Sequence, residues 1–419
     1  MSRHETINAR AGAARTIAVI HEDEEIMKHM PLEGIRILEI GGYISLPLGT
    51  SLLCSLGAEV VKVERPVVGE DFRRGANAGS PYFRQYNHGK RSLAVDLKTP
   101  EGLELVKSLV PRFDVVLENL RPGKIDAIGL GEDVCRELRP DVVFGSVTGF
   151  GASGPLANRP AYDTIGHAFG GLYSIWGEQG HPQLAGGLSA DLITGITTAT
   201  GVLAALVGRE RTGEGQRLET SIMEAVSILT TDSITQRFEL GYDPTRTSRH
   251  PQAQNFCVPT ADGKFIAVHL SSSQKFWQAL CRAMERPDLA EDPRFAEYRA
   301  REANYFELAP IVEHQFSTRT NEHWEQVLIA HDVPFAPVLS ISGYLQNEQI
   351  KHLEIVDVQD DGLALVRAPW LFDGERPERR GRAPRVGADT REVAGEVLGE
   401  EQIAELVSAG VLSVDDEVA

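Results

Sequence analysis

Residues 35–64 read IRILEIGGYISLPLGTSLLCSLGAEVVKVE, and this stretch decides the fold. Its first six residues are a largely apolar run between glycines, which is typical of a buried β-strand. Residues 45–57 predict a helix that ends at Gly57, and residues 60–64 predict a second strand. A strand, a helix and a strand in this order form a βαβ unit, in which the two strands are parallel.

The same alternation continues along the chain. Residues 114–119 and 141–147 predict two more strands, and residues 101–110 and 132–138 predict helices that precede them. Thr99 and Pro100 are a typical helix start, because a hydroxyl caps the first turn and proline suits the first helical position. We therefore expect an α/β fold with a Rossmann-like large domain, whose parallel sheet is covered on both faces. Ligands of such sheets bind beyond the carboxyl ends of the strands, which here are residues 41–45, 64–65, 119–121 and 148–151.

The character of the sequence changes after about residue 235, and this change predicts a second, smaller domain. Asp262-Gly263 is a typical hairpin turn between two strands, and the helical segments that follow indicate an α+β domain. The predicted parts are an N-terminal extension (1–30), a large domain (31–222), a linker (223–245), a small α+β domain (246–345), a second linker (346–382) and C-terminal helices that complete the large domain (383–419). Both linkers are expected to be extended.

The balance of charge restricts the partners of the protein. The 419 residues carry a formal net charge of −18, and such a surface repels nucleic-acid phosphates and anionic lipids. We expect no segment to approach the roughly 18 apolar residues that span a bilayer, and we expect the apolar stretch 190–211 to be a helix buried in the protein. The N-terminus does not resemble a signal peptide, and the four cysteines form no pair. A cytoplasmic protein without nucleic-acid or membrane partners is expected.

Familiar cofactor and metal motifs are missing from the sequence. The first strand is followed by GGYISLPLG and not by G-x-G-x-x-G, which disfavours a dinucleotide, although Glu64 has the place of a ribose-binding acid. No P-loop, H-E-x-x-H, G-x-S-x-G or Cys/His metal pattern occurs, so neither a metal site nor a tightly bound cofactor is expected. Basic residues gather near the strand ends, where they suit a polyphosphate ligand or are solvated surface charges. They are Lys62, Arg65, Lys90, Arg91, Lys98, Arg121 and Lys124.

A lone acid, Asp191, stands where the glycine turn of GGLSADLITG (186–195) meets the apolar helix. Ser189 is expected to cap this helix, which places Asp191 in the first turn, where the helix dipole stabilises an anion by about 0.3–1 kcal/mol. Asp191 is therefore either a capping carboxylate or an ionised nucleophile with an ordinary pKa of about 3.9, which Gly186 and Gly187 leave open to a ligand. Asp163 is a second candidate nucleophile, or a buried hydrogen-bonded acid in a turn.

Eight segments of the chain, in order and spacing, resemble the class III coenzyme A transferases, the CaiB/BaiF type that includes formyl-CoA and carnitine CoA-transferases. They are PLEGIRILEI, LGAEVVKVERP with GEDFRR, YFRQYNHGKRSLAVDLKTPEG, DVVLENLRPGKIDAIGL, RPAYDTIGHAFGG, GGLSADLITGITTATGVLAAL, RTGEGQRLETSIMEAV and HDVPFAPV. The resemblance extends over residues 31–413. It implies an enzyme that moves CoA from an acyl-CoA to a carboxylic acid, and an interlocked homodimer in which each chain is threaded through the other.

The resemblance also implies roles for individual residues. The family's nucleophilic aspartate, in a G-x-x-x-A/G-D stretch, falls on Asp191, which would carry first an acyl anhydride and then a CoA thioester. The residues implied in the acyl pocket are Tyr162, Asp163, His167, Gly186 and Gly187. The residues implied in binding the CoA substrate are Tyr43, Ile44, Ser45, Arg65, Val95, Lys98, Asn119, Leu120 and Arg159, the last in place of a family lysine.

Some positions depart from the family pattern. Ala127 stands where the family commonly has a phosphate-binding arginine, so we expect Arg121 or Lys124 to make that contact. His167 replaces a frequent glutamine. The segment SRHPQAQNFCVPT (248–260) lacks the four glycines of formyl-CoA transferase, which argues against the formyl/oxalate subgroup.

Two other functions are compatible with the sequence. The α-methylacyl-CoA racemase branch has the same fold and uses a His–Asp pair where this chain has Tyr162–Asp163, so His167 would have to supply the second acid/base group. The third function is that of a non-catalytic or nicotinamide-binding sheet protein. The missing glycine fingerprint argues against nicotinamide.

Overall fold

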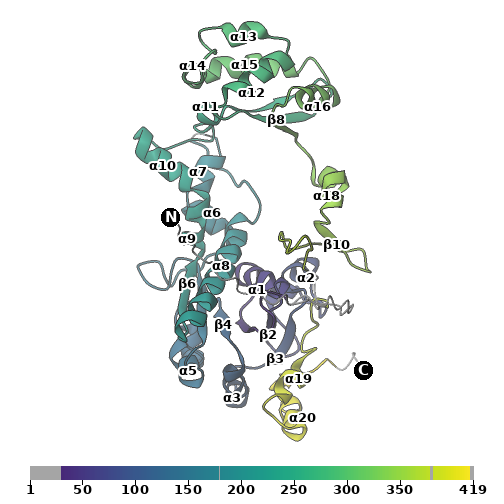
Figure 1. The fold of residues 1–419 in the computed structure, drawn as a ribbon. Helices are drawn as coiled ribbons and strands as arrows, with labels where there is room; N and C mark the ends of the chain where they lie inside the picture. Colours follow the sequence, from purple (N-terminus) through teal and green to yellow (C-terminus); the bar gives the residue numbers. More distant parts are fainter. Residues whose placement is uncertain (1–29, 179, 378–380, 416–419) are drawn as a thin grey trace, which may run out of the picture.

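A computed structural model describes residues 30–178, 180–377 and 381–415, which form an elongated molecule with two bodies (Figure 1). The predicted N-terminal extension lies, apart from Met30, outside the described residues. The larger body contains a seven-stranded sheet. Its strand order is β12 (Leu412–Ser413), β3 (Arg91–Val95), β2 (Glu59–Glu64), β1 (Arg36–Ile40), β4 (Val115–Glu118), β5 (Val143–Thr148) and β6 (Arg217–Ser221).

The sheet is mostly but not wholly parallel. Six strands run parallel to one another, and the short edge strand β12 pairs antiparallel with β3. The sequence did not predict β3 or β12. The apolar part of β3 is only three residues long and follows the basic segment that drew attention to charge, and β12 has two residues, so neither is long enough for periodicity to identify it.

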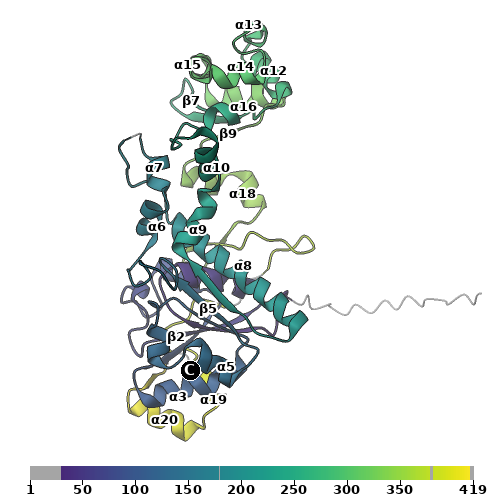
Figure 2. The same ribbon diagram turned by 90° about the vertical axis from the view of Figure 1, so that its left-hand side faces the viewer.

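Successive residues of the central strands point to opposite apolar layers, so helices cover both faces of the sheet. In β1, Ile37 packs in one layer, whereas Leu38 and Ile40 pack in the other. The first layer contains α1 (Ser45–Ser55) and α8 (Ser189–Thr212). The opposite layer contains α3 (Pro100–Leu109), α4 (Lys124–Ile128), α5 (Glu132–Leu138), α19 (Thr390–Gly395) and α20 (Glu400–Ser408). Figure 2 shows the sheet between α8 on one side and α3, α5, α19 and α20 on the other.

The predicted start of α3 is confirmed. The Thr99 hydroxyl accepts a hydrogen bond from the N–H of Gly102 at 3.1 Å, and Pro100 is the first helical residue. A cap of this kind stabilises a helix because it satisfies a backbone donor that has no partner inside the helix.

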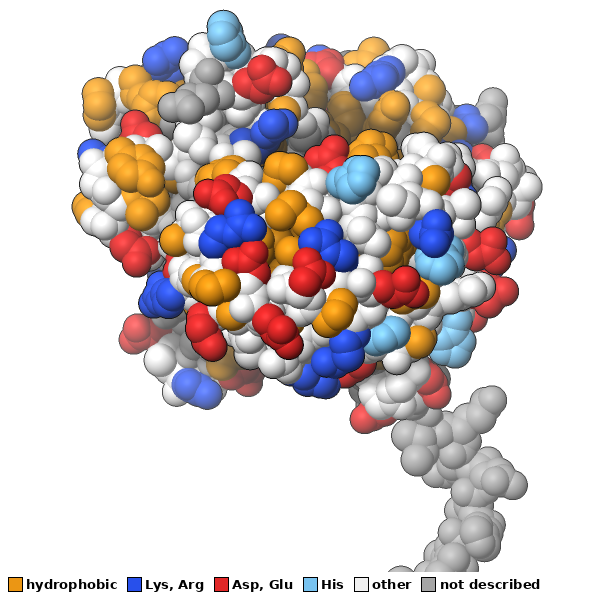
Figure 3. Space-filling view, turned by 90° about the horizontal axis from the view of Figure 1, so that it is seen from above, with side chains coloured by type: hydrophobic (Ala, Val, Ile, Leu, Met, Phe, Trp, Pro, Cys, Tyr) orange, Lys and Arg blue, Asp and Glu red, His pale blue; other side chains and the backbone are white. Residues whose placement is uncertain are grey.

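The smaller body has its own sheet and its own core. The antiparallel strands β7 (Asn255–Pro259), β8 (Phe265–His269) and β9 (Phe335–Pro337) form the sheet, and Gly263 has a φ of +74° in the predicted hairpin turn. Trp277 and Trp324 are central to the core. Its helices are α11 (His250–Ala253), α12 (Gln274–Ala283), α13 (Pro287–Glu291), α14 (Tyr298–Ala303), α15 (Tyr305–Phe316) and α16 (Asn321–Ala330). Acidic and basic side chains are interspersed over the outer face of this body (Figure 3).

Two separate segments connect the bodies, one on each side of the molecule (Figure 1). The first contains α9 (Ile222–Leu229) and α10 (Thr231–Leu240), so the prediction that residues 223–245 are extended is wrong. The Ser221 hydroxyl caps α9 by accepting from the N–H of Glu224 at 3.1 Å. The second contains α17 (Ile341–Gln346), α18 (Glu348–His352) and the hairpin of β10 (Val356–Val358) and β11 (Ala364–Val366), so residues 346–382 are not simply extended either.

Helix α8 is the longest helix among the described residues, and it corrects one expectation. It is long and apolar enough to cross a membrane, by length and composition only, so the prediction that no segment approaches this limit is wrong. Half of its most apolar 18-residue window is buried inside the molecule. It crosses α1 closely, because Gly49 and Gly195 have no side chains: a Cβ on Gly49 would lie 2.9 Å from the carbonyl oxygen of Gly195.

Candidate active site

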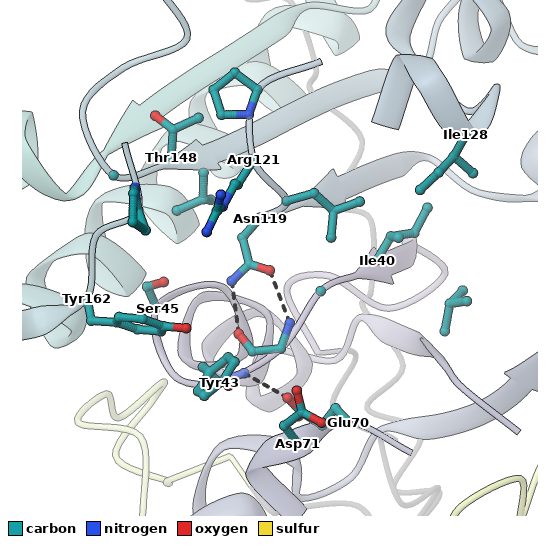
Figure 4. A pocket seen from close by; sticks show the side chains of 18 of the residues that line it. Ile40, Tyr43, Ser45, Glu70, Asp71, Asn119, Arg121, Ile128, Thr148 and Tyr162 are labelled. Atoms are coloured by element: carbon teal, nitrogen blue, oxygen red, sulfur yellow. Dashed lines mark hydrogen bonds between the residues drawn. The ribbon is translucent and has the colours of Figure 1, made fainter. Parts of the chain in front are cut away.

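A cavity of about 580 Å³ opens at the carboxyl ends of the parallel strands (Figure 4). The last residues of β1, β2, β3 and β5 line it, together with the loop after β4. The sequence predicted this position, because residues 41–43, 45, 64–65, 119–121 and 148–149 from the expected strand ends are all on its wall. Helices α2 (Pro81–Asn87), α6 (Asp163–Phe169) and α7 (Leu172–Trp176) lie in the same body.

Three side chains fix the loop that follows β1, which forms one wall of the cavity. The Lys62 ammonium donates to the carbonyl oxygen of Gly41 at 2.8 Å. The Asn119 amide donates to the carbonyl of Gly42 at 2.9 Å and accepts from its N–H at 3.0 Å, as Figure 4 shows. The Glu70 carboxylate accepts from the N–H of Tyr43 at 2.7 Å, and Tyr43 has a φ of +65°. The family resemblance implied that Asn119 contacts CoA, but its side-chain amide is occupied by this loop.

Several of the basic residues that the sequence offered for a phosphate ligand are structural. Lys62 and Lys90 are fully buried and pair with Glu39 at 2.7 and 2.8 Å. Burial by itself would raise the pKa of Glu39, but the two ammonium groups outweigh it and lower the pKa to about 2. Arg91 bridges Glu59, Asp389 and Glu392.

Glu64, the candidate ribose acid, is also occupied. Its carboxylate oxygens accept from the Arg73 guanidinium at 2.7 and 2.6 Å and from the Ser92 hydroxyl at 2.7 Å. The N–H of Glu70 is a fourth donor at 3.1 Å, so this buried acid has no position left for the ribose hydroxyl that its place in the sequence allowed.

Four cations do reach the cavity wall: Arg65, Lys98, Arg121 and Arg159. Arg65 pairs with Asp71, and both side chains are more than half exposed. Arg159 lies over the ring of Phe150, 5.7 Å from its centre. Within the described ranges, the side chains of Lys98 and Arg121 contact no carboxylate, and Arg121 points into the cavity from the loop after β4 (Figure 4). The cavity therefore offers positive charge that the protein does not itself neutralise.

Asp191 reaches the same cavity from the first turn of α8. Four other acids line the cavity, and each accepts from a donor that the structure shows. These donors are Arg73 for Glu64, the N–H of Tyr43 for Glu70, Arg65 for Asp71 and the N–H of Lys98 for Asp96. Among the described residues, no donor lies within hydrogen-bond distance of the Asp191 carboxylate. Within the described residues, Asp191 is therefore the one cavity carboxylate that accepts no hydrogen bond.

The start of α8 differs from the prediction. Ser189 does not cap the helix, because its hydroxyl is bonded to Nε2 of His167 at 2.6 Å. Asp163 takes this role instead: its Oδ1 accepts from the N–H of Ala190 at 2.9 Å and from the N–H of Asp191 at 3.1 Å. Asp163 is thus the buried, hydrogen-bonded acid of the two interpretations that the sequence allowed.

The environment of Asp191 changes its proton affinity. Burial, and after it the negative charge of Asp163, raise the pKa of Asp191 from 3.8 to about 7. The expectation of an ordinary carboxylate that is fully ionised at neutral pH is therefore wrong. The site holds an acid that exchanges its proton near neutrality.

The remaining predicted residues fall into two groups. Tyr43, Ser45, Val95, Leu120 and Tyr162 line the cavity, and the rings of Tyr43 and Tyr162 meet edge to face with centres 5.5 Å apart (Figure 4). Six residues lie off its wall: Ile44, Lys124, Asp163, His167, Gly186 and Gly187. Ile44 is buried with Phe72 and Phe83.

Sequence reasoning missed Glu70, which holds Tyr43 in place and pairs with Lys62. The only sequence signal for this residue was its place as the first acid of the GEDFRR segment (69–74).

Comparisons with known proteins agree with this architecture. The family model described as CoA-transferase family III matches residues 32–390. A succinate–glutarate CoA-transferase from Agrobacterium fabrum is 33% identical, over 88% of this chain and 96% of its own. A formyl-CoA:oxalate CoA-transferase from Streptomyces coelicolor is 32% identical, over 91% and 99%. The crystal structure of a CaiB/BaiF family protein from Brucella suis superposes with a TM-score of 0.76 at 29% identity, over 88% of this chain and 100% of that chain.

These similarities confirm the family resemblance that eight short segments suggested. Overall identity does not separate the subgroups, because the glutarate and the oxalate enzymes are almost equally similar to this chain. The match nevertheless covers both bodies of the molecule and the cavity between the strand ends and α8. The chain belongs to CoA-transferase family III, and it is a CoA-transferase.

Proposed function

We propose that this CoA-transferase acts through a covalent intermediate on Asp191. The carboxylate attacks the thioester carbonyl of the donor acyl-CoA, the carbon–sulfur bond breaks, and CoA leaves as a thiolate. The thiolate attacks the Asp191 carbonyl of the mixed anhydride, which releases the donor acid and leaves an aspartyl-CoA thioester. The acceptor carboxylate displaces CoA from this thioester, and the thiolate then attacks the acceptor's acyl carbon, which yields the new acyl-CoA and restores Asp191. Thioester and anhydride are of similar energy, so no ATP is consumed.

One observation carries the proposal: Asp191 is the cavity acid without a bonded donor among the described residues. A carboxylate that is paired with a guanidinium or an ammonium has its lone pairs engaged and is a poorer nucleophile. The pKa of Asp191, which burial and the charge of Asp163 raise to about 7, also makes its ionised form more basic than an ordinary aspartate. Both properties favour attack on a thioester.

The cations of the cavity wall support a role in binding the CoA substrate. CoA carries a diphosphate and a 3′-phosphate, and arginine and lysine are the side chains that best bind such groups. We propose that Arg65, Lys98 and Arg121 bind these phosphates. Arg121, and not Lys124, is the proposed substitute for the family arginine that Ala127 replaces, because Arg121 lines the cavity and Lys124 does not.

The proposed substrates are acyl-CoAs of dicarboxylic acids. This step rests on a relative at 33% identity that is named for succinate and glutarate. A second carboxylate on the acyl group would find positive charge in the cavity, where the side chain of Arg159 contacts no acid of the described chain. Succinyl-CoA as donor and glutarate as acceptor are therefore the first pair to assay.

The experiment that tests the nucleophile compares the wild type with Asp191→Asn and Asp191→Ala. We expect transfer from succinyl-CoA to glutarate to fall by about a thousandfold or more, while CoA binding changes little. Borohydride or hydroxylamine should trap an adduct on the 189–212 peptide of the wild type only. A variant that transfers CoA at the wild-type rate, or a wild type that turns over without any adduct, would rule out the assignment.

The racemase alternative loses its candidate acid/base group. His167 is only 1% exposed, does not line the cavity, and has both ring nitrogens within bonding distance of protein groups. A proton cannot move between this ring and the α-carbon of a substrate in the cavity without a rearrangement of the site.

We further propose that the protein is an interlocked homodimer. Large apolar side chains are exposed on the loops and helices between the two bodies, and Phe238, Leu184 and Ile341 are at least 78% exposed. Where such side chains form a contiguous patch, the patch marks a surface that binds another molecule. A second copy threaded between the two connecting segments would cover them.

A further inference from the structure

His167 lies on α6 behind the cavity wall, and its buried ring contacts two aromatic rings, a carboxylate and a hydroxyl. The ring is 1% exposed and lies 5.4 Å from the ring centre of Tyr173 and 5.5 Å from that of Trp176. Nδ1 lies 3.2 Å from Oδ2 of Asp163, and Nε2 lies 2.6 Å from the hydroxyl of Ser189. This histidine is therefore a fixed internal part of the site, although no substrate in the cavity can touch it.

The hydrogen bonds determine where the imidazole proton is. The backbone N–H of Ala190 can only donate, and Oδ1 of Asp163 at 2.9 Å and Nε2 of His167 at 3.2 Å share it. Nε2 is therefore an acceptor without a proton, and the Ser189 hydroxyl donates to it as well. The proton of a neutral ring is then on Nδ1, which lies 3.2 Å from Oδ2 of Asp163. The contacts of the ring therefore favour the Nδ1–H form.

Asp163 joins this ring to the nucleophile. One of its carboxylate oxygens lies 3.2 Å from Nδ1 of His167, and the other accepts from the N–H groups of Ala190 and Asp191. No side chain caps α8 at its N-cap residue, Leu188. The first turn of α8, with Asp191 in it, is therefore held by Asp163 and His167 and not by a cap of its own.

We infer that His167 is a positioning residue of the transfer reaction: its Nδ1–H form holds Asp163 and the first turn of α8, and so fixes the direction in which the Asp191 carboxylate faces the cavity. This inference rests on the proposed role of Asp191. A nucleophile that must attack a thioester carbonyl, and later lie in reach of a thiolate, is sensitive to displacements of about 1 Å, which can cost about a hundredfold in rate. Substrate binding, which depends on the strand ends, should be affected much less.

The test uses the full-length protein with succinyl-CoA and glutarate. His167→Leu removes both bonds of the ring, and we expect kcat to fall about 10- to 100-fold while KM for succinyl-CoA changes less than about threefold. His167→Gln keeps a donor and an acceptor and should recover most of the original kcat.

Ser189→Ala removes only a second donor to Nε2 and should change kcat less than about threefold. His331→Gln, on the residue that follows α16 in the smaller body, is the control for replacing a partly buried histidine and should leave kcat unchanged.

Two kinetic outcomes would overturn the inference. One is a folded His167→Leu protein with wild-type kcat; the other is an equal loss of kcat in His167→Leu and His167→Gln, because a merely space-filling role would not distinguish a residue that keeps the hydrogen bonds.

A measurement that needs no catalysis guards against a variant that fails to fold. Nitrogen-15 spectra of the wild-type histidines should show one buried ring with its proton on Nδ1 and a bare Nε2. A proton on Nε2 of His167 would contradict the inferred hydrogen bonds and overturn the inference. This result does not depend on Asp191 being the nucleophile, so the two proposals can fail separately.

Discussion

Asp191 is the proposed nucleophile, and a carboxyl group can attack a thioester only after it has lost its proton. Because burial and the charge of Asp163 raise the pKa of Asp191 to about 7, this acid is protonated well below neutrality. We expect kcat/KM for succinyl-CoA to rise with pH through about 7 and to fall about tenfold for each pH unit below it. Asp163→Asn removes the like charge and should move this limb to lower pH. A rate that stays constant down to about pH 5 would contradict the assignment.

Two neighbouring cations provide a matched test of phosphate binding. Arg121 points into the cavity, whereas Lys124, three residues later at the start of α4, does not line it. We expect Arg121→Met to raise KM for acyl-CoA about tenfold, because methionine cannot donate to the phosphate as arginine does. Lys124→Met removes the same charge from the first residue of α4 and should leave KM within about twofold. Initial rates over a range of acyl-CoA concentrations give both KM values. Equal increases of KM in the two variants would mean that only the overall charge matters.

At the scale of the elements, the buried ammonium group of Lys62 stabilises the ends of β1 and β2. Lys62 contacts the carboxylates of Glu39 and Glu70 and the carbonyl of Gly41. Removing one partner of a buried pair typically costs about 3–5 kcal/mol, so Lys62→Met should lower the free energy of unfolding in urea by about 3 kcal/mol. Lys98→Met is the control, since Lys98 lies on the cavity wall outside the core and should change stability by less than about 0.5 kcal/mol. Similar stabilities of the two variants would show that the pair is dispensable.

The elements also show how far the sequence predicts this site. Alternating strands and helices located the cavity, because the carboxyl ends of parallel strands must meet at one edge. This pattern did not predict which charged side chains near the cavity are paired inside the protein. Glu39 and Lys62 are opposite each other in the register of β1 and β2, so their pairing was available from the strand alignment, but Lys90 arrives from a separate loop.

The start of α8 was less predictable still. A serine before an apolar helix predicts a cap, yet the Ser189 hydroxyl bonds His167, 22 residues earlier, and Asp163 caps the helix. The packing of α6 against α8 brings these groups together, and no local pattern encodes such a contact.

At the scale of the whole molecule, the exposed apolar side chains between the two bodies lead to the last prediction. Phe238 on α10 is 85% exposed, and Ile341 at the start of α17 is 78% exposed, although they lie on different connecting segments. If two chains interlock through these segments, the dimer cannot separate without unfolding. We expect light scattering after size exclusion to give about 92 kDa, twice the 45.8 kDa of the chain, and this mass to persist on dilution to nanomolar concentration.

An ordinary dimer that two flat surfaces hold together would behave differently. It would release monomers in proportion to dilution, and Phe238→Glu would then shift the equilibrium to monomers in the native state. In an interlocked dimer the same variant lowers the unfolding temperature but leaves the native mass at about 92 kDa, because the topology and not the local contact retains the partner. A monomer of 45.8 kDa that transfers CoA at the wild-type rate would show that each chain contains its complete active site and that the second copy is not required.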